Sequence, residues 1–319
     1  MQKKNLWNKI GPVLCLFLLS PVIAELLSGS TPLSRGEQLI FESIFYGPAA
    51  LLIREFVRRR QLGWFSVILL GFAFGIIEEC LLLQSAFNPH FLNFDISYGR
   101  VWGVNWAWSE IIIINHSFWS ITIPVFIAET IFPGRRTEPW LNQWGIGIFA
   151  VLLLLSSYGF YTTFIKMSGF TTSWIHYTIA GLLASGVILI AANLRDKQIV
   201  KFPVKTPPAW VTGFISFLVS LFWLNLLSQV FQKEHGVPAM FVELTGLIVL
   251  VVWLVIILGW INSKWNNTYR FSLAAGALYA GMVFGLIILL PTKNSLDIVG
   301  QICFILIVSV LLIFRRKRL

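Results

Sequence analysis

Ten apolar stretches, each about 20 residues long, are the feature that most limits how this chain can fold. A helix needs roughly 20 mostly apolar residues to cross a bilayer. Lipid offers no partner to backbone N–H and C=O groups, so each stretch must be helical. The sequence therefore predicts an all-α polytopic membrane protein with ten transmembrane helices, at about 9–27, 38–57, 64–87, 108–132, 144–165, 173–193, 209–231, 238–260, 271–290 and 297–314.

The low content of charged residues agrees with this prediction. Only 12% of the 319 residues are Asp, Glu, Lys or Arg, and 57% are apolar. An ordinary soluble domain has about twice that charged fraction. The chain has too few ionisable groups to cover a surface exposed to water, which excludes a soluble enzyme and a nucleic-acid-binding module.

The Lys and Arg residues predict the orientation of the spans. If the N-terminus is cytoplasmic, 19 of the 24 cations fall in cytoplasmic segments, including Arg54, Arg58, Arg59 and Arg60 and the four cations at 315–318. Such an excess is typical of the cytoplasmic side of membrane proteins. We therefore expect a multi-pass protein of the plasma membrane with both termini in the cytoplasm. The net charge of +10 then orients the chain in its lipid bilayer, and no nucleic-acid partner is expected.

We expect a single polytopic membrane domain over residues 1–319. Within it, 1–193 holds spans one to six and most buried polar residues, 194–208 forms a cytoplasmic loop, and 209–319 holds spans seven to ten. The first span lacks a clear cleavage site of small residues, so we expect it to be retained rather than removed as a signal peptide. The three cysteines lie in apolar runs and predict no disulfide framework.

Polar side chains from several spans are expected at similar depth below the outer surface. Glu79 and His116 lie roughly 12 Å below the outer ends of spans three and four, at about 1.5 Å per residue. A charged residue in mid-bilayer costs roughly 3 kcal/mol, so such residues usually face a partner or a cavity. We therefore predict a polar chamber that opens outward, with Glu78, Glu79 and His116 at its floor. Substrate would be contacted there by Glu110, Asn225 and Glu243.

The adjacent carboxyl groups of Glu78 and Glu79 are not expected to ionise together in a low dielectric, so they should share a proton. A carboxyl close to an imidazole suits general acid–base catalysis and also proton coupling in a carrier. Gly71, Gly75 and Glu79 fall on one helix face, where the glycines let a neighbouring helix approach.

Structural roles are open for the same residues. His116 and His176 would then serve as hydrogen-bonding groups between helices, and Glu25 and Glu42 would snorkel to the outer interface. Glu129 lies at the inner end of span four, where Arg135 or Arg136 would pair with it. No ligand pair has the i, i+4 spacing of a helical zinc site, so we predict no metal site and no cofactor.

The longest outer loop, residues 88–107, joins the spans that carry Glu79 and His116. It is rich in aromatic residues and contains one cation, Arg100. The loop would form a lid or a rim that grips substrate through Arg100 and Trp106. Alternatively, it is an aromatic hairpin that rests among the lipid headgroups.

The order of these groups resembles the CAAX-processing and bacteriocin-processing family of intramembrane glutamate-type endopeptidases. Glu78 and Glu79 lie on span three, His116 on span four and His176 on span six, in the order of that family. The resemblance implies that Glu78 or Glu79 is a general base that activates water against a peptide bond. It also implies that His116 and His176 position the water or stabilise the oxyanion.

The resemblance covers about residues 78–180. The chain departs from the family's pattern at Leu83, Ile112 and Ala180, where the family has Arg, Phe and Asn. Three functions follow as hypotheses. The chain is an intramembrane hydrolase that cleaves a membrane peptide, a carrier that couples proton or cation movement to a small solute, or a non-catalytic membrane subunit.

Overall fold

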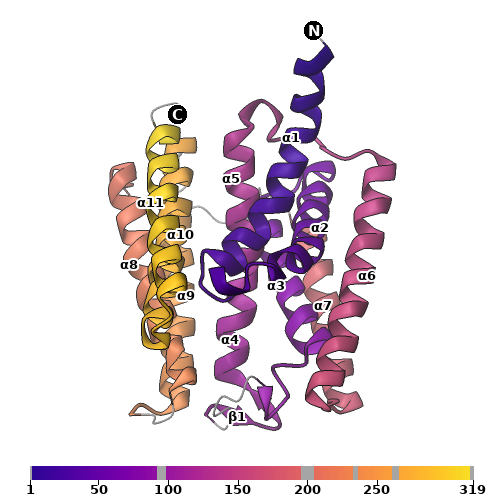
Figure 1. Ribbon diagram of the computed structural model, residues 1–319, viewed down its shortest axis with the longest axis vertical. Helices are drawn as coiled ribbons and strands as arrows, with labels where there is room; N and C mark the ends of the chain where they lie inside the picture. Colours follow the sequence, from indigo (N-terminus) through magenta and orange to yellow (C-terminus); the bar gives the residue numbers. More distant parts are fainter. Residues whose placement is uncertain (1, 92–97, 195–204, 233–235, 261–265, 317–319) are drawn as a thin grey trace.

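The protein is a bundle of long helices with one very short strand pair (Figure 1). The computed structural model describes residues 2–91, 98–194, 205–232, 236–260 and 266–316. The two strands, β1 (Arg100–Val101) and β2 (Val104–Asn105), pair antiparallel at one end of the bundle. The prediction of an all-α polytopic membrane protein is therefore confirmed.

All ten predicted spans form helices, and three of them include a π-helical turn. The first span is α1 (Gln2–Pro21) followed by the π-helical turn η1 (Val22–Leu26). The third is α3 (Trp64–Ile76) followed by the π-helical turn η3 (Ile77–Leu82). The fourth consists of α4 (Trp106–Asn115), the π-helical turn η5 (His116–Thr122) and α5 (Ile123–Ile131). The remaining spans are α2 (Gln38–Arg59), α6 (Gln143–Ser168), α7 (Trp174–Asn193), α8 (Ala209–Leu227), α9 (Ala239–Trp260), α10 (Asn267–Leu289) and α11 (Ser295–Arg316).

Short 3-10 turns, each three or four residues long, complete the described secondary structure. They are η2 (Leu33–Arg35), η6 (Pro133–Arg135), η8 (Ser228–Phe231) and η9 (Leu290–Thr292). Each lies at or next to the end of a longer helix, where such turns are common.

Nine helices of the described chain are long and apolar enough to cross a membrane. The tenth, α2, is 22 residues long but carries several charged side chains, including Arg54 and Glu55. It packs against α1, α3 and α6, and its charged side chains Arg54 and Glu55 are buried in protein. The buried charged side chains of α2 therefore contact protein rather than lipid, as ionisable residues within membrane bundles usually do.

The helices form two groups that lie side by side, α1–α7 and α8–α11 (Figure 1). Both chain ends lie at the same end of the bundle, as an even number of crossings requires. Their cytoplasmic location stays a prediction, as does the division of the domain at residues 194–208, most of which lie outside the described residues.

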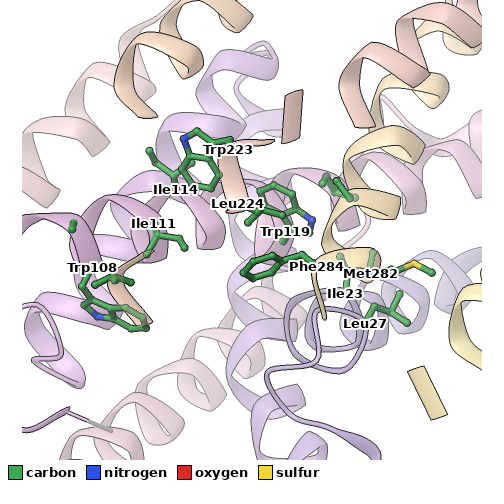
Figure 2. Packing of buried hydrophobic residues seen from close by; sticks show 14 of the residues in the cluster. Ile23, Leu27, Trp108, Ile111, Ile114, Trp119, Trp223, Leu224, Met282 and Phe284 are labelled. Carbon is green, nitrogen blue, oxygen red and sulfur yellow. The ribbon is translucent and has the colours of Figure 1, made fainter. Parts of the chain in front are cut away.

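A buried apolar cluster joins the two groups (Figure 2). Ile23 and Leu27 from the first span meet Trp119 from η5, and all three contact the region of Met282 and Phe284 on α10. The indole N–H of Trp119 donates to the carbonyl of Ala277 at 3.2 Å. In lipid, close packing of this kind, rather than a hydrophobic force, holds helices together.

Glycines allow α3 to lie directly against the fourth span. A Cβ atom on Gly71 would lie 2.9 Å from the carbonyl oxygen of Ser117, and one on Gly75 would lie 2.9 Å from that of Ile113. Real Cβ atoms do not approach so closely, so larger residues would push the helices apart. The predicted role of these glycines, close approach beside Glu79, is confirmed.

The predicted partners of Glu129 were wrong. Arg54 Nε donates to its Oε1 at 3.0 Å, and Arg58 donates from Nε and Nη2 to its two oxygens at 2.7 Å each. Arg54 and Arg58 lie one turn apart on the face of α2 that meets α5. Arg135 follows the end of α5 and pairs with Glu138 at 2.9 Å instead.

The turn between α1 and α2 is packed against the last two helices. Gly29 adopts a left-handed conformation (φ 77°), and a Cβ there would lie 3.0 Å from the Cα of Gly285 on α10. Gln301 Nε2 on α11 donates to the carbonyl of Leu27 at 2.8 Å. Backbone outside a helix is tolerated at membrane depth only when its polar groups find such partners.

Candidate functional site

The imidazole of His116 lies between two carboxyl groups in the interior of the α1–α7 group. Its Nε2 is 2.9 Å from Glu79 Oε1, and its Nδ1 is 3.3 Å from Glu78 Oε2. The Ser120 hydroxyl also lies 3.0 Å from Nδ1. Glu78, Glu79 and His116 are only 2–3% exposed. The depth of these residues had suggested that they form the floor of a chamber that opens outward. Instead, they are buried in protein.

A change of helix type at η3 and η5 accompanies this arrangement. Glu78 and Glu79 lie in the π-helical turn η3, and His116 begins the π-helical turn η5. A π turn inserts one residue into the helix and rotates the side chains that follow it, and such turns are frequent at functional sites. Both neighbouring glutamates thereby reach the same imidazole, although consecutive residues on an α-helix point in different directions.

Tyr46, on α2, completes one side of the cluster. Its hydroxyl donates to Glu78 Oε1 at 2.7 Å. Its ring stacks on the imidazole of His116, with ring centres 5.8 Å apart and planes inclined by 21°. Sequence reasoning missed Tyr46, because a single tyrosine in an apolar span carries no sign of its neighbours.

Ser85 and Trp108 hold the other side. The Ser85 hydroxyl donates to Glu79 Oε2, and the indole N–H of Trp108 donates to the Ser85 oxygen at 2.9 Å. Glu79 therefore contacts His116 through one oxygen and Ser85 through the other. This pair of contacts fixes the orientation of its carboxyl group.

Two further glutamates extend the cluster toward the α1–α2 turn. Glu25, in η1, interacts electrostatically with His116 and Glu79 and reaches the Tyr46 side chain. Glu42 lies near Glu25 on α2 and accepts a hydrogen bond from the Thr31 hydroxyl at 2.7 Å. Their sequence positions suggested snorkelling to the interface, and both residues are partly buried and have protein partners. We call Glu25, Tyr46, Glu78, Glu79 and His116 the acidic cluster.

The acidic cluster places three carboxyl groups and one imidazole close together, and Glu78, Glu79 and His116 among them are buried. Three carboxylates would repel one another strongly there, and one imidazolium would balance only one of them. The negative charge of the cluster is therefore only partly balanced by its own members.

The side chains of Glu78, Glu79 and His116 also lie close enough together to surround a metal ion. One ligand atom each from Glu78, Glu79 and His116 lie within 4.8 Å of one another. Nε2 of His116 is in hydrogen-bond contact with Glu79 Oε1, whereas Glu78 Oε2, 3.3 Å from Nδ1, has no hydrogen-bond partner among the described residues. A proton placed between Glu78 Oε2 and Nδ1 would satisfy that oxygen, and we interpret the arrangement as a proton-sharing site for this reason.

His176 lies outside the acidic cluster. It is in the first turn of α7, where its Nε2 is 3.0 Å from the carbonyl oxygen of Trp102 and its Nδ1 is 3.1 Å from the Ser173 hydroxyl. Its ring stacks on Phe87, with centres 4.9 Å apart. These local contacts link α7 to the β1–β2 hairpin, and the catalytic role implied for His176 stays a prediction.

The residues predicted to contact substrate are dispersed over the end of the bundle that carries β1 and β2. Arg100 donates from Nη1 to the carbonyls of Phe87 and Gly103 at 2.9 and 2.8 Å, and partial burial lowers the pKa of its guanidinium. Trp106 is half-exposed at the start of α4. The hairpin is thus tied to the segment after η3, while residues 92–97 of the predicted lid lie outside the described residues.

The other three predicted contacts divide into a pair and a single residue. Glu110 and Glu243 lie near enough to each other to interact electrostatically, between α4 and α9. Asn225 donates to the carbonyl of Leu221 on its own helix at 2.7 Å. None of the three belongs to the acidic cluster, and their contact with a substrate stays a prediction.

The fold and the site define a multi-pass helical membrane protein with a buried cluster of glutamates and one histidine. Residues 14–170 of the chain are similar to an uncharacterized membrane protein family, and this segment includes every member of the acidic cluster. No curated protein and no solved structure matches the chain. The resemblance to glutamate-type endopeptidases therefore stays a prediction.

Proposed function

We propose that the protein is a proton-coupled carrier of the plasma membrane, and that the acidic cluster is its proton-binding site. The observation that carries this proposal is the imidazole of His116 between the carboxyl groups of Glu78 and Glu79. Ionisable groups buried in a membrane bundle commonly mark proton pathways. A proton taken up or released by these three groups changes the net charge of the site by one unit, and transfer among them needs only their direct contacts.

Glu42 and Glu25 supply an entry route for the proton. Glu42 is only partly buried, and Glu25 interacts both with it and with His116 and Glu79 of the acidic cluster. With both termini in the cytoplasm, the α1–α2 turn beside Glu42 would face the outer side. A proton from outside would pass from Glu42 to Glu25 and then to His116 and the other glutamates of the cluster.

Coupling to a solute requires that protonation changes helix packing. The contact between Glu79 and His116 joins η3 to η5, and the glycine face of α3 lies against the same segment. Protonation of Glu79 would replace a charged contact with a weaker neutral one. The two helices would then favour a second arrangement, as alternating access requires.

The test uses the full-length protein in liposomes that contain a pH-sensitive dye. Small solutes of several classes are added outside, and proton entry is followed with the wild type and with Glu79→Gln. We expect at least one solute class to drive proton entry, and Glu79→Gln to reduce that entry by about tenfold or more. Glu37→Gln is the matched control, since Glu37 is an exposed carboxyl beside α2 and outside the cluster. Equal proton entry in Glu79→Gln and wild type would contradict the proposal.

A glutamate-type intramembrane hydrolase is the second candidate, and the 2.9 Å contact between Glu79 and His116 favours it. Glu79 would act as the general base toward water, His116 would orient it, and the Tyr46 hydroxyl would donate to the oxyanion. A hydrolase would cleave a membrane-embedded peptide in sealed liposomes without net proton movement. Loss of that product in Glu79→Gln, with no solute-driven proton entry in the wild type, would replace the carrier proposal with this one.

A further inference from the structure

A second feature lies on the opposite side of the fourth span from the acidic cluster. An apolar cavity of about 230 Å³ lies between this span and helices α8, α9 and α10. Trp119, Phe126, Trp223 and Trp253 are among its lining residues. His116 and Ser120 face the acidic cluster, whereas Phe118 and Trp119 face this cavity, so the same segment serves two separate sites.

A second cavity, also of about 230 Å³, continues from the first toward the end of the bundle that carries the chain termini. Trp64, Phe126 and Arg270 line both cavities, which therefore adjoin. The lining of the second cavity is more polar than that of the first. It includes the guanidinium groups of Arg58, Arg136 and Arg270 and the single carboxylate of Glu129.

The charges in the second cavity do not cancel. Arg58 is paired with Glu129 through two hydrogen bonds of 2.7 Å. Arg136 donates to Asn267 Oδ1 at 2.8 Å, which is a neutral acceptor. Among the residues that line the cavity, three arginines and one glutamate sum to a charge of +2, and such a lining favours an anionic group such as phosphate.

We infer that the two cavities together form a binding site for an anionic phospholipid of the surrounding leaflet. The acyl chains would occupy the apolar cavity, and the phosphate would lie near Arg136 and Arg270. The order of the two cavities along the bundle matches that of a lipid, with its charged head toward the membrane surface and its chains toward the middle.

Trp223 gives an independent indication of a ligand in the apolar cavity. Its side chain is 4% exposed and lines the cavity, and its indole N–H has no hydrogen-bond partner among the described residues. A buried donor without an acceptor is unfavourable. The ester carbonyl of a phospholipid, which lies between head and chains, is an acceptor of the type this N–H lacks.

The experiment measures lipid retained by the full-length protein in neutral detergent, by native mass spectrometry. The added probes are phosphatidylglycerol, phosphatidylcholine with the same chains, and inorganic phosphate alone. We expect retained phosphatidylglycerol in the wild type and roughly tenfold weaker retention in Arg270→Gln, because one charge-assisted contact is lost. Arg60→Gln is the matched control. It removes the same charge at the same end of the bundle from an exposed side chain that lines neither cavity.

A second variant tests the apolar part. Ala274→Phe places a ring in the first cavity, and we expect it to weaken phosphatidylglycerol retention while the unfolding temperature of the lipid-free protein stays within a few degrees of wild type. If Ala274→Phe does not fold, Trp223→Phe removes the indole N–H while keeping an aromatic ring, and it is expected to weaken retention several-fold. Equal retention of phosphatidylcholine, equal retention by Arg270→Gln and Arg60→Gln, or binding of inorganic phosphate as tight as that of the lipid would each overturn the inference.

Discussion

The imidazole Nε2 of His116 lies 2.9 Å from Oε1 of Glu79, and this contact joins two π-helical turns on neighbouring spans. The two residues are 37 positions apart in the chain. The contact therefore reports directly on how η3 and η5 are packed, and changes in that packing should be visible in both stability and function.

Replacement of Tyr46 with Phe should destabilise the acidic cluster. The variant removes the hydroxyl that donates to Glu78 Oε1 and leaves a buried acceptor unsatisfied. The expected cost is about 1–3 kcal/mol in the free energy of unfolding. Thermal unfolding in detergent would measure it, with Tyr158→Phe as the control because that side chain is 69% exposed. An unchanged unfolding temperature in Tyr46→Phe would show that the hydroxyl contributes nothing to the cluster.

A methyl group at Gly75 should separate α3 from the fourth span. The added Cβ would lie 2.9 Å from the carbonyl oxygen of Ile113, so the backbone must shift, at a cost of about 1–3 kcal/mol. Because Glu79 lies one turn further along, proton entry should fall together with stability. Gly147→Ala is the control, since nothing lies within 4 Å of its added methyl group. Equal behaviour of the two alanine variants would contradict the close packing described for α3.

Replacement of His176 with Ala tests the resemblance to glutamate-type endopeptidases. The structure predicts a local effect, because His176 contacts the carbonyl of Trp102 and stacks on Phe87. Hydrogen exchange of residues 99–106 should become faster, while solute-driven proton entry is retained. Loss of function with unchanged exchange in the hairpin would instead place His176 in the reaction, as the resemblance implies.

Removal of the charge of Arg54 should be strongly destabilising. The side chain is 1% exposed, donates to Glu129 at 3.0 Å and lies 3.4 Å from the ring centre of Trp140. Loss of one partner of a buried ion pair typically costs about 3–5 kcal/mol. Chemical unfolding in detergent should show that loss in Arg54→Gln, and a much smaller change in Arg60→Gln. Similar midpoints of chemical unfolding for the two variants would show that the buried contacts of Arg54 do not contribute to stability.

Several features could be predicted from the sequence because they depend on simple periodicity and depth. Apolar length predicted the ten helices, and helical rise placed Glu79 and His116 at the same depth on adjacent spans. The spacing of Gly71, Gly75 and Glu79 predicted the closely packed face of α3. Each of these inferences needs only the geometry of a regular helix.

Other features could not be predicted, because they depend on departures from that geometry or on long-range packing. Glu25, Glu78 and His116 lie in the π turns η1, η3 and η5, which change the direction of their side chains. No residue pattern in the sequence predicts these turns. Glu25 was expected at the interface for that reason. Arg54 was counted with the cytoplasmic cations, although α2 carries it into the protein interior to meet Glu129. His176 matched the expected order along the chain, but order does not determine distance.

The turn between α1 and α2 also has a consequence for biosynthesis. Gln301 donates a hydrogen bond to the carbonyl of Leu27, which is 274 positions away in the chain, and Gly285 packs against Gly29. The α1–α2 turn can form its final contacts only after α10 and α11 have entered the bilayer. Glu25 immediately precedes this turn, so the ribosome must finish the chain before the cluster is complete. A prematurely terminated product would carry Glu25 without the two helices against which the turn beside it packs.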